Sequence, residues 1–147
     1  MENFLKSIWA KLLRIVLPAA AVVMGAFSGS YQKSIPVTGA DGSVERVDVI
    51  VTNYFDFAAN GLMDWAPMIC MLLCIAAVVC GVVCLFKETE NSLTVLANML
   101  CMGLVADLLI MIFLTPTVLG WCIVGVLTAA LIITAAQEMK MEDAKRK

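Results

Sequence analysis

Long apolar runs alternate with short polar segments along the chain, and their lengths predict its architecture. The four runs are residues 12–29, 66–86, 93–114 and 118–136. Only Arg14 and Asp107 place a charge within them. Each run is close to the ~20 residues that a helix, rising about 1.5 Å per residue, needs to cross roughly 30 Å of hydrocarbon. The pattern is typical of a multi-pass membrane protein.

We therefore expect an all-α membrane protein with four transmembrane helices in one integral membrane domain, residues 1–147. The predicted helices are residues 4–29, 65–86, 92–114 and 116–138. Short connections make helices two and three, and helices three and four, antiparallel neighbours. Asp64 is the expected N-cap of helix two, Asn91 or Ser92 that of helix three, and Thr115 that of helix four, with Pro116 in its first turn.

The first run is the least regular of the four. Residues 4–16 place Lys6, Lys11 and Arg14 on one helical face and apolar residues on the other, which predicts an amphipathic start lying in the lipid headgroups. Pro18 predicts a kink, because proline removes a backbone donor. We expect the segment to be retained rather than cleaved as a signal peptide. The alternative is a re-entrant first run with three crossing helices.

The long loop between helices one and two, residues 30–64, predicts a small β-hairpin followed by a short helix. The expected strands are residues 31–37 and 43–51, joined by a turn rich in glycine. The expected helix, residues 54–60, follows Asn53. An isolated two-stranded hairpin is marginal in water. Its cover is therefore either the short helix or the hairpin of a neighbouring subunit, paired through the strand that carries Val47 and Val49.

Basic residues cluster before helix one, after helix two and after helix four, whereas the long loop has only Lys33 and Arg46. Cytoplasmic segments of membrane proteins carry an excess of Lys and Arg. We therefore expect both termini in the cytoplasm, the loop of residues 30–64 outside it, and a location in the plasma membrane.

Small residues recur at four-residue spacing in three of the predicted helices and let backbones approach closely. Gly25 and Gly29 belong to the first helix, Gly81 to the second and Gly125 to the fourth. Packing within the chain accounts for most of these positions. A bundle of four helices cannot turn all of these small-residue faces inward. Those that remain on the outer surface favour contact with another copy, and therefore a homo-oligomer.

Asp107, in helix three, is the most informative single residue, since a carboxylate in hydrocarbon must be paired, wetted or protonated. It is either a protonated packing group bonded to Thr128, Ser28 or a backbone carbonyl, or a proton-exchanging group that lines a pathway, or the partner of a basic residue on another subunit. Asn98 is a second polar membrane site, on roughly the opposite face of the same helix.

The composition excludes several other classes. The net charge of −2, without a long basic run, argues against nucleic-acid binding. The six cysteines lie inside the apolar runs, histidine is absent, and no catalytic motif is present. Met68, Cys70, Met71 and Cys74 could supply soft ligands for Cu(I), but core packing explains them better. We therefore expect no enzymatic activity, no cofactor and no metal site.

The sequence thus predicts a non-enzymatic membrane protein that forms a homo-oligomeric pore or scaffold-like assembly in the lipid bilayer. The alternatives are a small proton-coupled transporter that uses Asp107 and an accessory subunit of a larger membrane complex.

Overall fold

The computed structural model describes residues 8–27, 29, 31–39, 42–55, 65–113 and 115–146. Its helices are α2 (Ile8–Ala26), α3 (Trp65–Phe86), α4 (Glu90–Phe113) and α5 (Val118–Arg146). All four are long and apolar enough to cross a membrane. The prediction of four such helices and a hairpin in the first loop is confirmed. The first run is helical over 19 residues, and this helix continues through Pro18.

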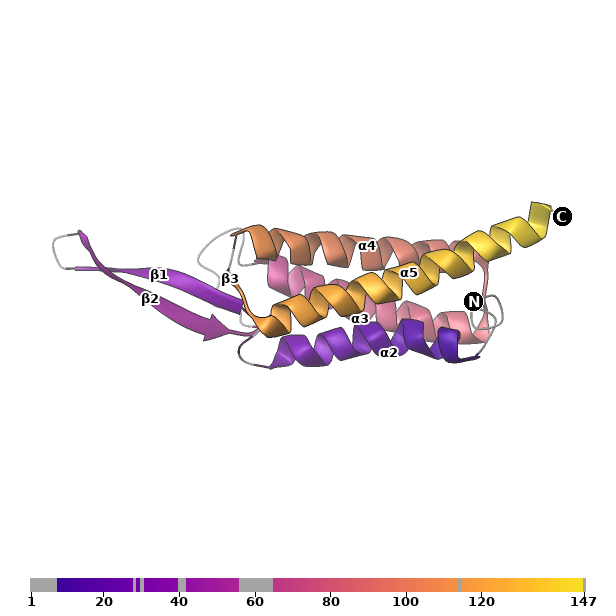
Figure 1. Cartoon of the computed structure of the whole chain (residues 1–147), viewed down its shortest axis with the longest axis horizontal. Coiled ribbons are helices and arrows are strands. Elements are labelled where there is room, and N and C mark those ends of the chain that lie inside the picture. Colours follow the sequence, from indigo (N-terminus) through magenta and orange to yellow (C-terminus); the bar gives the residue numbers. More distant parts are fainter. Residues whose placement is uncertain are drawn as a thin grey trace.

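The helices form a bundle in which each one packs against the next in the sequence, and α5 closes the ring by packing on α2 (Figure 1). The interior is filled by large apolar side chains such as Met71, Leu96, Leu100 and Leu127, all at most 1% exposed. Valine, leucine and isoleucine side chains also cover much of the outer surface. Such a surface is stable where the surrounding solvent is hydrocarbon rather than water.

The start of α2 and the end of α5 lie at one end of the bundle and the hairpin lies at the other (Figure 1). We call these the terminal end and the hairpin end. Trp65 and Trp121, in the first turns of α3 and α5, are exposed at the hairpin end, and Trp9 is exposed in the first turn of α2. Tryptophan favours the two membrane interfaces. The exposed rings therefore mark both borders of the apolar belt.

The basic face at the start of α2 does not lie where we predicted it. Ala10 and Arg14 are fully buried inside the bundle, whereas Ile8 and Leu12 point outward. The basic face of this helix therefore binds the protein interior rather than lipid headgroups. The reason is that Arg14 needs hydrogen-bond partners, which it finds inside the protein. Ile8 and Leu12 need none and are well solvated by hydrocarbon on the lipid side.

The hairpin consists of β1 (Tyr31–Thr38) and β2 (Val44–Thr52), which agree with the predicted strands to within about a residue. The strands pair antiparallel from Tyr31↔Thr52 outward, with an irregularity at Val37/Thr38. This ribbon projects well beyond the helices (Figure 1). A third strand, β3 (Thr115–Pro116), pairs with the base of β1 and gives the order β2-β1-β3.

The base of the hairpin is fastened to the bundle by backbone hydrogen bonds. The Gly29 amide donates to the Thr52 carbonyl at 3.2 Å, and the Tyr54 amide donates to the Gly25 carbonyl at 2.9 Å. Gly29 has φ 108°, a conformation that glycine adopts without strain. Its carbonyl accepts the Thr117 hydroxyl at 2.5 Å. The ribbon therefore leaves the bundle in a fixed direction.

The helix caps differ from those predicted. Thr89 caps α4, because its hydroxyl accepts the Ser92 amide at 3.2 Å while the Ser92 hydroxyl accepts the Thr89 amide at 3.0 Å. Thr115 belongs to β3, and α5 begins after Thr117. The last helix also extends to Arg146 rather than ending near residue 138. The predicted cap at Asp64 and most of the short helix of residues 54–60 lie outside the described residues.

Candidate functional site

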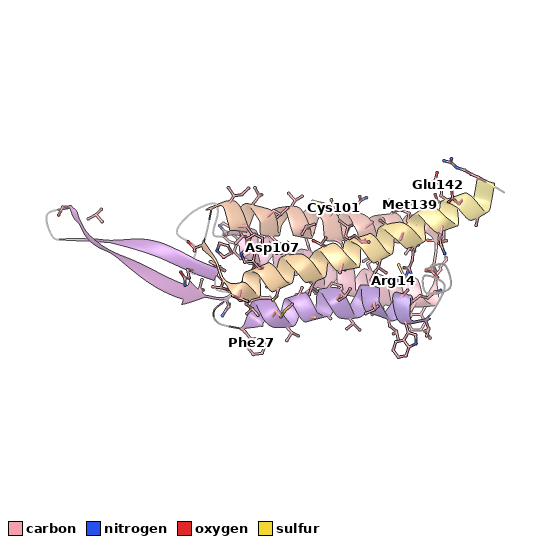
Figure 2. The ribbon with its side chains drawn as sticks, viewed as in Figure 1. Arg14, Phe27, Cys101, Asp107, Met139 and Glu142 are labelled. Carbon is pink, nitrogen blue, oxygen red and sulfur yellow. The ribbon has the colours of Figure 1, made fainter. Side chains whose placement is uncertain are left out.

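The Asp107 carboxylate lies inside the bundle toward the hairpin end and is fully buried (Figure 2). The Tyr54 hydroxyl donates a hydrogen bond to its Oδ1 at 2.6 Å. Tyr54 follows β2 and is itself 1% exposed, with its ring edge-on to that of Tyr31 at 5.6 Å. Asp107 thereby joins α4 to the base of the hairpin.

The second carboxylate oxygen, Oδ2, has no hydrogen-bond partner among the described residues. A buried polar atom without a partner is uncommon, because its desolvation is not compensated. Burial, reinforced by the negative charge of Asp107, raises the pKa of the Tyr54 hydroxyl far above its ordinary value. Tyr54 therefore keeps its proton and acts as a donor at any physiological pH.

The partner of Asp107 was not among those predicted. The Thr128 hydroxyl donates instead to the Val124 carbonyl of its own helix at 2.8 Å, and Ser28 lies outside the described residues. Tyr54 was assigned to the short helix of residues 54–60, whereas the structure shows a turn at Tyr54 and Phe55, in which the Asn53 side chain accepts the Phe55 amide. The sequence prediction gave Asn53 only as the start of a short helix, and it gave no reason to turn Tyr54 inward.

A second polar group, the Arg14 cluster, lies toward the terminal end and consists of Lys11, Arg14, Glu88 and Gln137 (Figure 2). One terminal nitrogen of Arg14 donates to Glu88 Oε1 and to Gln137 Oε1, both at 2.9 Å. The other donates to the Cys84 carbonyl at 3.3 Å. Lys11 forms an ion pair with the other oxygen of Glu88. The cluster connects α2, α5 and the loop between α3 and α4.

Electrostatics favour the ionised form of this cluster. Arg14 is fully buried, and guanidinium remains charged in proteins. Partial burial alone would raise the pKa of the Glu88 carboxyl, but hydrogen bonds from Lys11 and Arg14 outweigh it and leave that pKa below its ordinary value. From the sequence, Arg14 was expected near one membrane interface, and no counter-charge was named for it. The available signal was an arginine inside an apolar run, which requires a counter-charge at similar depth.

The other predicted membrane site, Asn98, is not brought together with Asp107. Asn98 is exposed on the outer face of α4, whereas Asp107 points into the bundle. The two residues therefore do not line a common path through this bundle.

The glycines predicted to mediate packing serve different purposes. A Cβ at Gly25 would come within 2.5 Å of Met71 Sδ, and one at Gly81 within 2.8 Å of Ile15 Cγ1, so both allow close helix approach within the chain. Gly29 forms the turn before β1. Gly125 is exposed, and a Cβ there would meet nothing within 4 Å. Val47 and Val49 lie in β2, across from Pro36 and Ser34.

Three of the four residues considered above as soft ligands are part of the core. Cys70, Met71 and Cys74 are at most 1% exposed, and the Cys70 thiol donates to the Gly103 carbonyl of α4 at 3.4 Å. Within the described part of the chain, no group of three or more His, Cys, Asp or Glu side chains is arranged to hold a metal ion.

No family model, curated protein or solved structure matches this chain. Its function must therefore be argued from the two polar groups, the outer surface of the helices and the projecting ribbon.

Proposed function

We propose that the protein is a non-enzymatic, integral membrane component of a homo-oligomeric, scaffold-like assembly, in which projecting hairpins join neighbouring copies. The observation that carries this proposal is the shape of the sheet. Strand β2 lies at its edge, and β3 covers only the two residues at the base of β1. The rest of the ribbon is two-stranded and stands away from the helices (Figure 1).

The physical argument rests on unpaired backbone groups. An edge strand presents a row of donors and acceptors that pairs readily with another strand. A two-stranded ribbon is marginally stable alone, so a third and fourth strand from another copy would stabilise it. Backbone pairing across the outer edge of β2, where Val47 and Val49 lie, would form a continuous sheet above the membrane.

The packing of side chains inside the helix bundle bears on whether the assembly contains a pore. Large apolar side chains fill the bundle between Asp107 and Arg14, so a path for ions would have to run between copies rather than through one of them. By the positive-inside rule, we place the terminal end in the cytoplasm and the hairpin end outside the plasma membrane.

The test is the mass of the purified particle in mild detergent, for the full chain and for a shortened hairpin. Residues 34–49 are replaced by Asn-Gly, which joins the cross-strand partners Lys33 and Ile50 by a two-residue turn. The base of the hairpin, including Tyr31 and Tyr54, is kept. We expect the full chain to be an oligomer and the shortened chain to form smaller particles with unchanged helix content.

Two outcomes would contradict the proposal. An unchanged oligomer after shortening would assign assembly to the helices alone and remove the hairpin from it. A monomeric full chain would exclude the homo-oligomer and leave an accessory role in a larger membrane complex as the surviving hypothesis.

The unpaired Oδ2 of Asp107 favours a second candidate, a small proton-coupled transporter. A buried carboxylate with one donor is incompletely stabilised when ionised and gains from binding a proton. In such a transporter, Asp107→Asn keeps the size but removes the titrating group, so proton-coupled uptake in reconstituted vesicles should stop. If Asp107 only packs, Asn retains the Tyr54 hydrogen bond and costs at most about 2 kcal/mol, whereas Leu leaves Tyr54 unpaired and costs more. Measured proton flux that is identical in wild type and Asp107→Asn excludes the transporter.

A further inference from the structure

The outer face of α4 carries a regular stripe of exposed side chains. The stripe consists of Val95, Asn98, Met102, Val105, Leu109 and Ile112. Its members are separated alternately by three and four residues, and the five apolar ones are 41–72% exposed. This is the spacing with which the helices of a coiled coil meet along one seam. We call it the α4 stripe.

Asn98 distinguishes this face from the other outer faces of the bundle. Within the described residues of the four apolar runs, it is the one exposed side chain that carries an amide, hydroxyl or charge. It lies eight residues after Glu90, about 12 Å along the helix, and therefore within the hydrocarbon. The Asn98 amide makes no hydrogen bond to the residues that the structure describes. Lipid tails cannot satisfy it.

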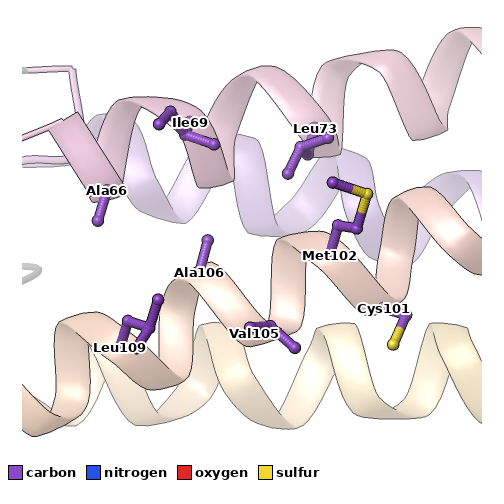
Figure 3. A pocket seen from close by; sticks show the side chains of 8 residues that line it. All are labelled: Ala66, Ile69, Leu73, Cys101, Met102, Val105, Ala106 and Leu109. Atoms are coloured by element: carbon purple, nitrogen blue, oxygen red, sulfur yellow. The ribbon is translucent and has the colours of Figure 1, made fainter.

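An apolar groove runs beside the stripe, between α3 and α4 (Figure 3). It has a volume of about 320 Å³. Ala66 on α3 and Ala106 on α4 leave the space, while larger residues, among them Ile69, Leu73, Met102 and Leu109, form its sides. Helix association in membranes depends on close van der Waals packing. The groove therefore offers a second helix a recess that begins about one turn from Asn98, at Cys101 and Met102.

From these observations we infer that the α4 stripe is the membrane interface with a second copy of this chain. Copies inserted in the same direction are related by a two-fold axis normal to the membrane, so that residues of equal depth meet. Asn98 then faces Asn98 of the partner subunit. An amide has both donors and an acceptor, so two of them satisfy each other, and a single asparagine in a coiled-coil seam fixes the register of the helices.

This interface rests on the proposed homo-oligomer but does not involve the hairpin. The stripe and the groove lie on α3 and α4, and a pair joined there leaves the edge of β2 free. A particle could therefore use both contacts, the α4 stripe to form pairs and the hairpins to connect them.

Disulfide trapping in native membranes tests the geometry. The exposed Cys101 and Cys122 are first changed to serine, and Asn98→Cys is then compared with Ile132→Cys, which places a thiol on the outer face of α5, where Ile132 is 63% exposed. On mild oxidation we expect a covalent dimer for Asn98→Cys and none for Ile132→Cys. No dimer for Asn98→Cys, or equal dimer for both, would overturn the interface.

A measurement of self-association in detergent gives an independent readout. Asn98→Leu should weaken dimerisation about three- to tenfold, the range measured for interhelical hydrogen bonds in membranes, while Asn98→Gln should preserve it. If the full chain is oligomeric but Asn98→Leu is unchanged and Asn98→Cys does not cross-link, the α4 interface is wrong and the proposed assembly stands. A monomeric wild type would overturn both.

Discussion

Single residues at opposite ends of the bundle fix its shape. Asp107 and Tyr54 fasten the hairpin end, and Arg14 with Glu88 fastens the terminal end. Both contacts join segments that are distant in the sequence, since 53 residues separate one pair and 74 the other. The fully buried contact between Asp107 and Tyr54 acts in a medium of low dielectric constant, where a hydrogen bond is worth more than it is in water.

The sequence identified Asp107 and Arg14 as exceptional but not their partners. A charge inside an apolar run is visible as a pattern, whereas the residue that meets it depends on how four helices and a loop come together. Tyr54 and Glu88 both lie outside the apolar runs, in segments that carry many other polar residues. Nothing local distinguishes them from their neighbours.

Glu88 provides a test of the Arg14 cluster. Glu88→Gln removes the negative charge between Lys11 and Arg14. Arg14 then stays buried without its counter-charge. We expect a loss of about 1 to 3 kcal/mol of stability at neutral pH, the usual range for a hydrogen bond to a charged group. The matched control is Glu142→Gln in the exposed tail of α5, where Glu142 pairs with Arg146 on the surface and the loss should stay below about 1 kcal/mol. Thermal unfolding in detergent measures both.

The pH dependence of Glu88 has a definite sign. Because the pKa of its carboxyl is lower in the folded state, the stabilisation is fully present above the ordinary glutamate pKa of about 4.3 and disappears as the pH falls through the lowered value. The stability difference between wild type and Glu88→Gln should therefore shrink as the pH is taken from 7 to 3. A difference that grows on acidification would show that Glu88 is not held ionised by Lys11 and Arg14.

Whole elements were predicted better than their ends. Hydrophobic run length located all four helices, and the strand-like residues on both sides of a glycine-rich turn located both strands, because each of these signals is summed over many residues. The position of a helix cap, in contrast, depends on only one or two side chains. Thr89, Asn91 and Ser92 are all suitable types, and the choice among them depends on the path of the preceding loop, as does the use of Thr115 in β3 instead of a cap.

Faces of helices were the weakest part of the sequence interpretation. The start of α2 has a basic face and an apolar face, and in a water-soluble protein or a surface helix the apolar face would be buried. Inside a membrane the preference is reversed, because hydrocarbon accepts Ile8 and Leu12 while Arg14 requires polar partners. The predicted helical periodicity was correct. Which face of α2 is buried depends on whether its surroundings are water or hydrocarbon, and the sequence pattern alone does not say this.

The molecule as a whole has two unlike ends. The terminal end gathers the start of α2, the loop between α3 and α4, and the end of α5, while the hairpin end carries the projecting ribbon (Figure 1). Short basic segments at the terminal end include Lys11, Lys87, Lys140 and Arg146, whereas the hairpin contributes Lys33 and Arg46. Since membrane insertion keeps Lys- and Arg-rich short segments in the cytoplasm, this asymmetry predicts one orientation for the whole bundle.

Accessibility labelling in intact cells tests that orientation. In a background with Cys101 and Cys122 changed to serine, single cysteines replace Ser43 in the hairpin and Lys87 and Glu142 at the terminal end, all of which are exposed. A membrane-impermeant maleimide should label Ser43→Cys at once, and Lys87→Cys and Glu142→Cys only after permeabilisation. The reverse result would turn the bundle over and put the ribbon in the cytoplasm. Labelling of all three sites before permeabilisation would mean that copies insert in both directions, and the parallel pairing of α4 stripes would then lose its geometric basis.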